Sequence, residues 1–78
     1  MLELYQIEKC PYCKKVREKL SELNLDFICR NMQSGSAKRQ ILITLGGKDQ
    51  VPFFVDMDKG ISMYESYKIV EYLEKTYS

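Results

Sequence analysis

The alternation of apolar and polar positions along the chain predicts a domain that mixes strands and helices. Residues 2–7 carry apolar side chains on both faces of an extended segment, which is typical of a strand covered on both sides. Over residues 11–24 apolar side chains recur every three or four positions, which indicates an amphipathic helix. The same two patterns return later in the chain. They predict strands at 25–29, 52–55 and 60–63, and helices at 37–45 and from residue 66 onward.

Glycine, serine and proline mark the boundaries between these segments. Ser34-Gly35-Ser36 precedes the second helix, and Gly46-Gly47 ends it. Pro52 is tolerated at the first residue of a strand, and residues 56–60 have the composition of a hairpin loop. Ser66 is expected to cap the last helix. The predicted order is βαβαββα in a mixed four-stranded sheet, whose first two strands are parallel because a strand–helix–strand unit crosses over.

Two cysteines stand at the predicted start of the first helix. Pro11 suits the first helical position, so Cys10 lies at the helix N-terminus and Cys13 lies one turn inside, on the apolar stripe. Unpaired N–H groups, the helix dipole and nearby lysines favour the thiolate form of Cys10, whereas Cys13 is expected to remain a protected thiol. This arrangement suits dithiol–disulfide exchange. A zinc site would need about four ligands, but the chain has no histidine and only one further cysteine, Cys29.

Length and composition narrow the class of protein. The 78 residues suffice for one domain, and a hydrophobic share of 45% favours a folded core. The formal net charge of +1 gives no indication that the protein binds nucleic acid or a membrane surface. The first residues show no signal-peptide pattern, and no apolar run approaches membrane-spanning length. We therefore expect a single domain over 1–78 in a reducing compartment, the cytoplasm, with Cys29 a small buried residue.

The sequence resembles the dithiol glutaredoxins of the thioredoxin superfamily. The resemblance is carried by Cys10-Pro11-Tyr12-Cys13 after a short strand, by Val51-Pro52, and by Glu65-Ser66 before a helix. These motifs cover nearly the whole chain in the order found in the family. They imply the thioredoxin fold in its minimal glutaredoxin form.

The resemblance also implies a cis bond at Val51-Pro52, although X-Pro bonds in general are mostly trans. In the family this bond turns the backbone of the preceding residue toward the cysteines. A peptide or glutathione would then pair with Val51 like an added strand. Tyr12 would flank the approach to the Cys10 sulfur and contact a thiol substrate.

Glu65-Ser66 is closer to the Glu-Ser of glutathione transferase N-terminal domains than to the Gly-Gly and acidic residues of many glutaredoxins. The N–H and hydroxyl of Ser66 would bind the carboxylate of the γ-glutamyl end of glutathione, and Glu65 would pair with its ammonium group. By resemblance, Lys9, Lys38 and Arg39 would meet the glycine carboxylate. From the residues alone, a helix cap and solvated charges explain all five positions equally well.

The resemblance therefore implies a glutathione-linked thiol–disulfide oxidoreductase. Cys10 would attack a disulfide or a glutathione mixed disulfide, and Cys13 or a second glutathione would resolve the product. Glutathione is expected as co-substrate, with no tightly bound cofactor and no metal. The expected partners are disulfide-containing or glutathionylated proteins. The chain itself is expected to be a monomer. Three alternatives remain: a glutathione-binding module, an iron–sulfur carrier, and an electron donor reduced by a thioredoxin-type reductase.

Overall fold

The structure, a computed structural model, describes all residues from 1 to 78 and has the predicted order of strands and helices. The strands are β1 (Leu2–Gln6), β2 (Phe27–Asn31), β3 (Phe53–Asp56) and β4 (Ile61–Tyr64). The helices are α1 (Pro11–Glu22), α2 (Gln40–Gly46) and α3 (Ser66–Tyr77), and a short 3₁₀ turn, η1 (Ala37–Arg39), leads into α2. The bounds of β1, β3 and β4 differ from the predicted ones by a single residue.

The four strands form one mixed sheet in the order β2-β1-β3-β4. β1 pairs in parallel with β2 and antiparallel with β3, and β3 pairs antiparallel with β4. At the centre of β1, Leu4 lies opposite Cys29 on one side and opposite Phe54 on the other. This topology is the thioredoxin fold that the sequence resemblance implied.

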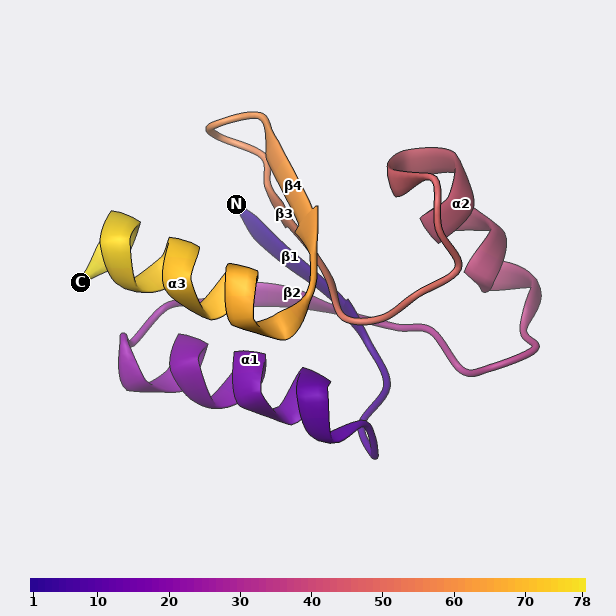
Figure 1. Cartoon of the computed structure of the whole chain (residues 1–78), viewed down its shortest axis with the longest axis horizontal. Helices are drawn as coiled ribbons and strands as arrows, with labels where there is room; N and C mark the ends of the chain where they lie inside the picture. Colours follow the sequence, from indigo (N-terminus) through magenta and orange to yellow (C-terminus); the bar gives the residue numbers. More distant parts are fainter.

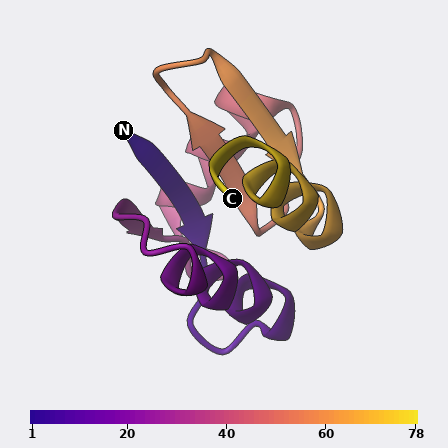
Figure 2. The same ribbon diagram turned by 90° about the vertical axis from the view of Figure 1, so that its left-hand side faces the viewer.

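Helices cover both faces of this sheet. α1 and α3 lie side by side against one face, and α2 packs against part of the other face (Figure 1, Figure 2). Neighbouring residues of a strand point to opposite faces, so Leu4 and Phe54 pack with α1 and α3, whereas Tyr5 and Phe53 pack on the side of α2. Each fully buried side chain of this size contributes about 1.5–3 kcal/mol. Two small cores on opposite faces of the sheet therefore hold the domain together.

β2 begins at Phe27 rather than at residue 25, because α1 ends in a hydrogen-bonded turn. Asn24 adopts a left-handed conformation with φ 58°, and the N–H of Leu25 donates to the Leu20 carbonyl at 2.9 Å. A left-handed residue followed by this hydrogen bond is a common helix ending. Leu25 then packs on the core between the sheet and the two helices. The apolar residue that suggested a strand therefore belongs to the end of the helix.

Cys29 is exposed, so the prediction that it is buried was wrong. β2 is an edge strand, and four of its five residues are exposed. The Cys29 sulfur lies 3.2 Å from Nε2 of Gln6, which donates a hydrogen bond to it. An edge strand needs fewer buried residues than a central one, and a small apolar side chain alone does not show which kind of strand carries it.

Candidate active site

Cys10 occupies the N-cap position of α1, as predicted. Its backbone is extended, with φ −74° and ψ 120°, and Pro11 is the first residue of the helix. The N–H of Cys10 donates to the carbonyl of Ile7 at 3.1 Å, and the N–H of Lys14 donates to the carbonyl of Cys10 at 3.0 Å. The first turn of α1 contains no acidic residue. The half-buried Cys10 side chain therefore lies at the positive end of a helix dipole.

Cys13 lies one turn further along α1 and is completely buried. Burial raises the pKa of the Cys13 thiol to about 12, and the neighbouring Cys10 adds to this rise. A hydrogen bond from the Ile7 backbone and the positive charge of Arg17 act in the opposite direction on the same pKa. Cys13 is therefore a protonated thiol at neutral pH, one turn from the partly exposed Cys10.

A pocket of about 370 Å³ opens beside this helix start. Three segments line it: the start of α1, the residues before β3, and the start of α3. The lining residues are Tyr12, Gln50, Val51, Pro52, Glu65, Ser66 and Tyr67. The pocket thus brings together five of the predicted site residues. Cys10 itself is not part of the lining, and the motif contributes Tyr12, which is 59% exposed, to the pocket.

The peptide bond between Val51 and Pro52 is cis, as the resemblance implied. Pro52 is buried and Val51 is partly buried on the pocket wall. Two lining residues, Gln50 and Tyr67, were not among the predicted site residues. Both are direct chain neighbours of predicted ones, and that adjacency is the only signal that the sequence offers for them.

Glu65, and not Ser66, is the N-cap residue of α3, so the predicted cap was wrong. The Glu65 carbonyl accepts hydrogen bonds from the N–H groups of Lys68 and Ile69, both at 3.1 Å. Its backbone has φ 71°, a conformation that few residues other than glycine adopt. The chain therefore turns one residue earlier than expected, and Ser66 begins the helix. Its side chain makes no hydrogen bond within the chain.

The Glu65 side chain faces the segment before β3. One of its oxygens, Oε1, accepts a hydrogen bond from Nε2 of Gln50 at 3.0 Å. Both residues line the pocket. This contact fixes the carboxylate on the pocket wall and leaves its second oxygen without a partner in the chain.

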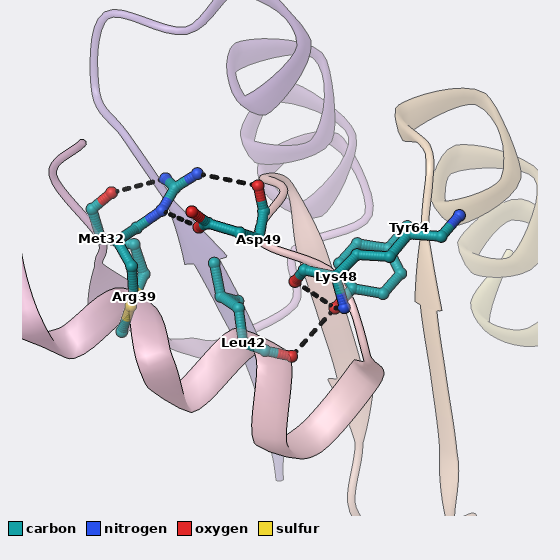
Figure 3. Close-up of polar contacts among 6 residues, drawn as sticks. All are labelled: Met32, Arg39, Leu42, Lys48, Asp49 and Tyr64. Carbon is teal, nitrogen blue, oxygen red and sulfur yellow. Dashed lines mark hydrogen bonds and ion pairs between the residues drawn. The ribbon is translucent and has the colours of Figure 1, made fainter. Parts of the chain in front are cut away.

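The three basic residues predicted for the site differ in exposure and in their partners. Lys9, before Cys10, and Lys38, in η1, are exposed, form no ion pair and do not line the pocket. Arg39 is only 14% exposed, and its Nε donates to Oδ1 of Asp49 at 2.6 Å. The same guanidinium donates to the Met32 carbonyl at 2.9 Å (Figure 3). Arg39 thus ties η1 to the segment that leads into Val51.

Tyr64 makes a second tie between α2 and that segment. Its hydroxyl lies 3.0 Å from the Leu42 carbonyl oxygen and 2.8 Å from the Lys48 carbonyl oxygen, and it accepts a hydrogen bond from the Lys48 N–H at 3.2 Å (Figure 3). The ring passes so close to Gly46 that a Cβ at that residue would overlap it. Together these contacts hold the chain in place where it approaches the pocket.

Neither a metal cluster nor a membrane-spanning helix accompanies this site. No group of three or more histidine, cysteine, aspartate or glutamate residues is placed to hold a metal ion. None of the helices combines the length and the apolar character that crossing a bilayer requires.

Comparison with known proteins connects this geometry to glutathione chemistry. Residues 4–78 match the sequence model of a family described as glutathione S-transferase, N-terminal domain. The chain is 35% identical over 79 residues to a glutathione S-transferase of Hyoscyamus muticus, a match that covers 99% of the chain and 36% of the transferase. It is 29% identical to an uncharacterized glutaredoxin-like 8.6 kDa protein in the rubredoxin operon of Clostridium pasteurianum, covering 96% of the chain and 100% of that protein.

A solved structure has the same fold. Glutaredoxin 2 from Salmonella typhimurium, solved in complex with glutathione, superposes with a TM-score of 0.82 at 25% identity. The match covers 95% of the chain and 33% of that protein. The chain thus spans about a third of the length of this glutaredoxin and of the Hyoscyamus transferase.

Proposed function

This chain belongs to the family of glutathione S-transferase N-terminal domains, in the glutaredoxin-like part of the thioredoxin superfamily, and we propose that it is a glutathione-linked thiol–disulfide oxidoreductase. One observation carries the proposal: the accessible Cys10 sulfur at a helix N-terminus stands one turn from the completely buried Cys13 thiol. Conjugation of glutathione to another molecule needs no second protein thiol. Reduction of a protein disulfide uses a second protein thiol to resolve the mixed disulfide.

The reaction begins with attack of the Cys10 thiolate on a sulfur of the substrate disulfide. A bond forms between the two sulfurs, the substrate disulfide breaks, and one substrate sulfur leaves as a thiol. When the mixed disulfide joins Cys10 to glutathione, a second glutathione releases it as oxidised glutathione. When it joins Cys10 to a protein, Cys13 attacks instead, and two glutathiones later reduce the Cys10–Cys13 disulfide.

The pocket offers groups that match the ends of glutathione. The Ser66 N–H and hydroxyl lie at the first residue of α3, whose first turn has no acidic residue, and suit a carboxylate. The second oxygen of Glu65 suits the adjacent ammonium group. The backbone of Val51 suits the peptide portion, in the manner of an added strand.

The glycine carboxylate of glutathione would find its charge partner among the exposed lysines. Lys9 and Lys38 remain in this role because neither forms an ion pair within the chain. Arg39 would act indirectly, because its guanidinium already binds Asp49 and the Met32 carbonyl. We propose that it acts by holding the segment that carries Val51.

A coupled assay on cysteine variants tests this function. One assay follows removal of glutathione from a glutathionylated peptide, and a second follows reduction of a protein disulfide, each with glutathione as reductant. Cys10→Ser should lose both activities, because a serine hydroxyl is a poor nucleophile at neutral pH. Cys13→Ser should keep the first and lose the second, and Cys29→Ser should keep both. Retention of either activity by Cys10→Ser would refute the proposal.

The match to transferase domains favours a second candidate, a module that binds glutathione without efficient turnover. Such a module would also use Glu65 and Ser66 but would not need Cys13. Calorimetric titration with glutathione separates the two. Binding by the unmodified chain, together with no turnover in either assay, would identify the module.

A further inference from the structure

Arg17 lies on α1 one turn after Cys13, on the same face of the helix. Its side chain is 20% exposed, whereas those of Lys14 and Lys15 are exposed. The guanidinium donates a hydrogen bond to Oε1 of Gln6, a completely buried residue at the end of β1. A cation therefore lies beside the interior of the molecule at the end of the sheet where Cys13 is buried.

The same guanidinium reaches the turn that carries Cys10. Its Nη2 donates to the carbonyl of Glu8 at 3.2 Å and lies 3.6 Å from Oε2 of that residue. Arg17 thus holds the residues on either side of Ile7. The carbonyl of Ile7 accepts the N–H of Cys10 at 3.1 Å. The Ile7 backbone also lowers the pKa of the Cys13 thiol. Ile7, whose carbonyl binds the N–H of Cys10, is therefore flanked on both sides by residues that Arg17 contacts.

We infer that Arg17 is a positioning residue for the second half of the exchange, in which Cys13 displaces the substrate sulfur from Cys10. This inference rests on the proposed function. It concerns the route in which Cys13, rather than a second glutathione, resolves the mixed disulfide on Cys10. In the step, the Cys13 sulfur bonds to the Cys10 sulfur and the bond from Cys10 to the substrate sulfur breaks. The substrate sulfur leaves with the electron pair of that bond and takes up, through solvent, the proton lost by Cys13. The cysteine pair is oxidised and the substrate disulfide is reduced.

The charges around Cys13 explain why this step needs help. Burial opposes the thiolate of Cys13, and this opposition remains when Cys10 is joined to the substrate in the mixed disulfide. Arg17 is the cation that favours it, and Glu8 lies on the solvent side of the guanidinium as its partner. The sheet contributes the neutral Gln6 here, and the buried residues of α3, Ile69 and Leu73, carry no charge. Without Arg17, fewer molecules would carry the attacking thiolate at a given pH.

A two-phase reaction with an aromatic disulfide reagent tests the inference. Cys10 attack releases one coloured thiol, and Cys13 attack on the resulting mixed disulfide releases a second, so stopped-flow absorbance resolves both steps in one experiment. The Cys29→Ser background removes the exposed third thiol. Arg17→Met removes the charge, Arg17→Lys keeps it, and Lys14→Met is the control that removes an exposed cation from the same helix.

We expect Arg17→Met to slow the second phase several-fold, because a higher pKa of the attacking thiol lowers its thiolate fraction by more than it raises the nucleophilicity. Its pH profile should move to higher pH, with the first phase changed less than about twofold. Arg17→Lys should recover most of the rate, and Lys14→Met should leave the second phase unchanged. An unchanged second phase in a folded Arg17→Met variant, or equal slowing of both phases, would overturn the inference. Because the reagent contains no glutathione, loss of glutathione-coupled turnover in the unmodified chain would refute the proposed function separately.

Discussion

The two ends of the sheet use polar groups in opposite ways. At the end where α1 and α3 begin, Cys10 is partly exposed, Ser66 has no hydrogen bond from its side chain, and the first turns of both helices contain no acidic residue. At the other end, where both chain termini lie, Asp56 is completely buried and its Oδ2 accepts the hydroxyls of Tyr72 at 2.7 Å and Tyr77 at 2.5 Å (Figure 1). One end leaves polar groups accessible, whereas the other buries a carboxylate that is bound through Oδ2.

This difference indicates that one end of the sheet contributes mainly to stability and that the other end carries the groups proposed for the reaction. The buried carboxylate of Asp56, the last residue of β3, binds two tyrosine hydroxyls in the second half of α3. Hydrogen bonds as well as apolar packing therefore stabilise this end of the sheet. A charge without partners could not remain buried there. The active end depends on that support, because the same α3 presents Ser66 to the pocket. Changes at the two ends should therefore affect different measurements.

Replacement of Asp56 should give the largest loss of stability. Asp56→Ala leaves the Tyr72 and Tyr77 hydroxyls without their acceptor, which should lower the free energy of unfolding by about 2–3 kcal/mol. Urea unfolding followed by circular dichroism measures this loss. Activity per folded molecule should stay unchanged, because the active cysteines lie at the other end of the sheet.

Asp26→Ala is the matched control, because Asp26 is exposed and forms no hydrogen bond or ion pair through its side chain. It should leave the unfolding midpoint nearly unchanged. Equal losses in the two variants, or a loss of activity in folded Asp56→Ala, would mean that the two ends are not independent.

The same cluster predicts how stability changes with pH. Burial alone would raise the pKa of Asp56, but the hydrogen bonds from Tyr77 and Tyr72 outweigh it and lower that pKa below its ordinary 3.8. Its contribution is therefore complete above about pH 4 and is lost as the pH falls through the lowered value. Burial and Asp56 raise the pKa of Tyr72 from 10.0 to about 12, so a second loss should accompany a rise in pH from 10.0 to about 12.

The comparison with Asp56→Ala isolates this effect. A hydrogen bond from Arg30 lowers the pKa of Glu3, and one from Lys19 lowers that of Glu74, so other carboxylates also contribute to acid unfolding. The difference in unfolding free energy between the two proteins should shrink at both ends of the pH range. The effect should be smaller than removal of the side chain, because a protonated carboxyl still accepts hydrogen bonds. A difference that is constant from pH 3 to 12 would contradict the role given to Asp56.

Gly46→Ala should disturb the active end through packing. A Cβ at Gly46 would overlap the Tyr64 ring, whose hydroxyl contacts Leu42 and Lys48. Overpacking of this kind costs about 1–3 kcal/mol. The apparent affinity for a glutathionylated peptide should also fall, because Lys48 lies just before the pocket segment. Thr44→Ala, at an exposed position of α2, should change neither. Unchanged affinity in Gly46→Ala would show that the pocket does not depend on this anchor.

The sequence predicts the placement of Cys10 and Cys13 because this placement is determined by nearby residues. Pro11 and the spacing of apolar residues set the start of α1, and that start determines the positions of both sulfurs. The alternation of apolar residues likewise predicts the strands of the sheet. The thioredoxin fold itself was predicted from the family resemblance, not from this alternation.

The features that the sequence could not predict depend on contacts between distant residues. Whether Cys29 is buried depends on β2 being at the edge of the sheet. The role of Arg39 depends on Asp49, which lies ten positions later and in a different segment. The start of α3 depends on the left-handed conformation of Glu65, which no preference of a glutamate would suggest. Periodicity carries no information about any of these.

Replacement of Ser66 should give the smallest effect and the sharpest separation of the two ends. Ser66→Ala removes a hydroxyl that lines the pocket and has no partner in the chain, and Glu65 provides the N-cap of α3. Stability should therefore stay nearly constant, whereas apparent affinity for a glutathionylated peptide should fall several-fold, the effect of one hydrogen bond worth about 1 kcal/mol. Ser21→Ala, on the exposed side of α1, should change neither quantity. A loss of stability with unchanged affinity would mean that the hydroxyl supports the helix start, as Asp56 supports its far end, and that the pocket does not use it.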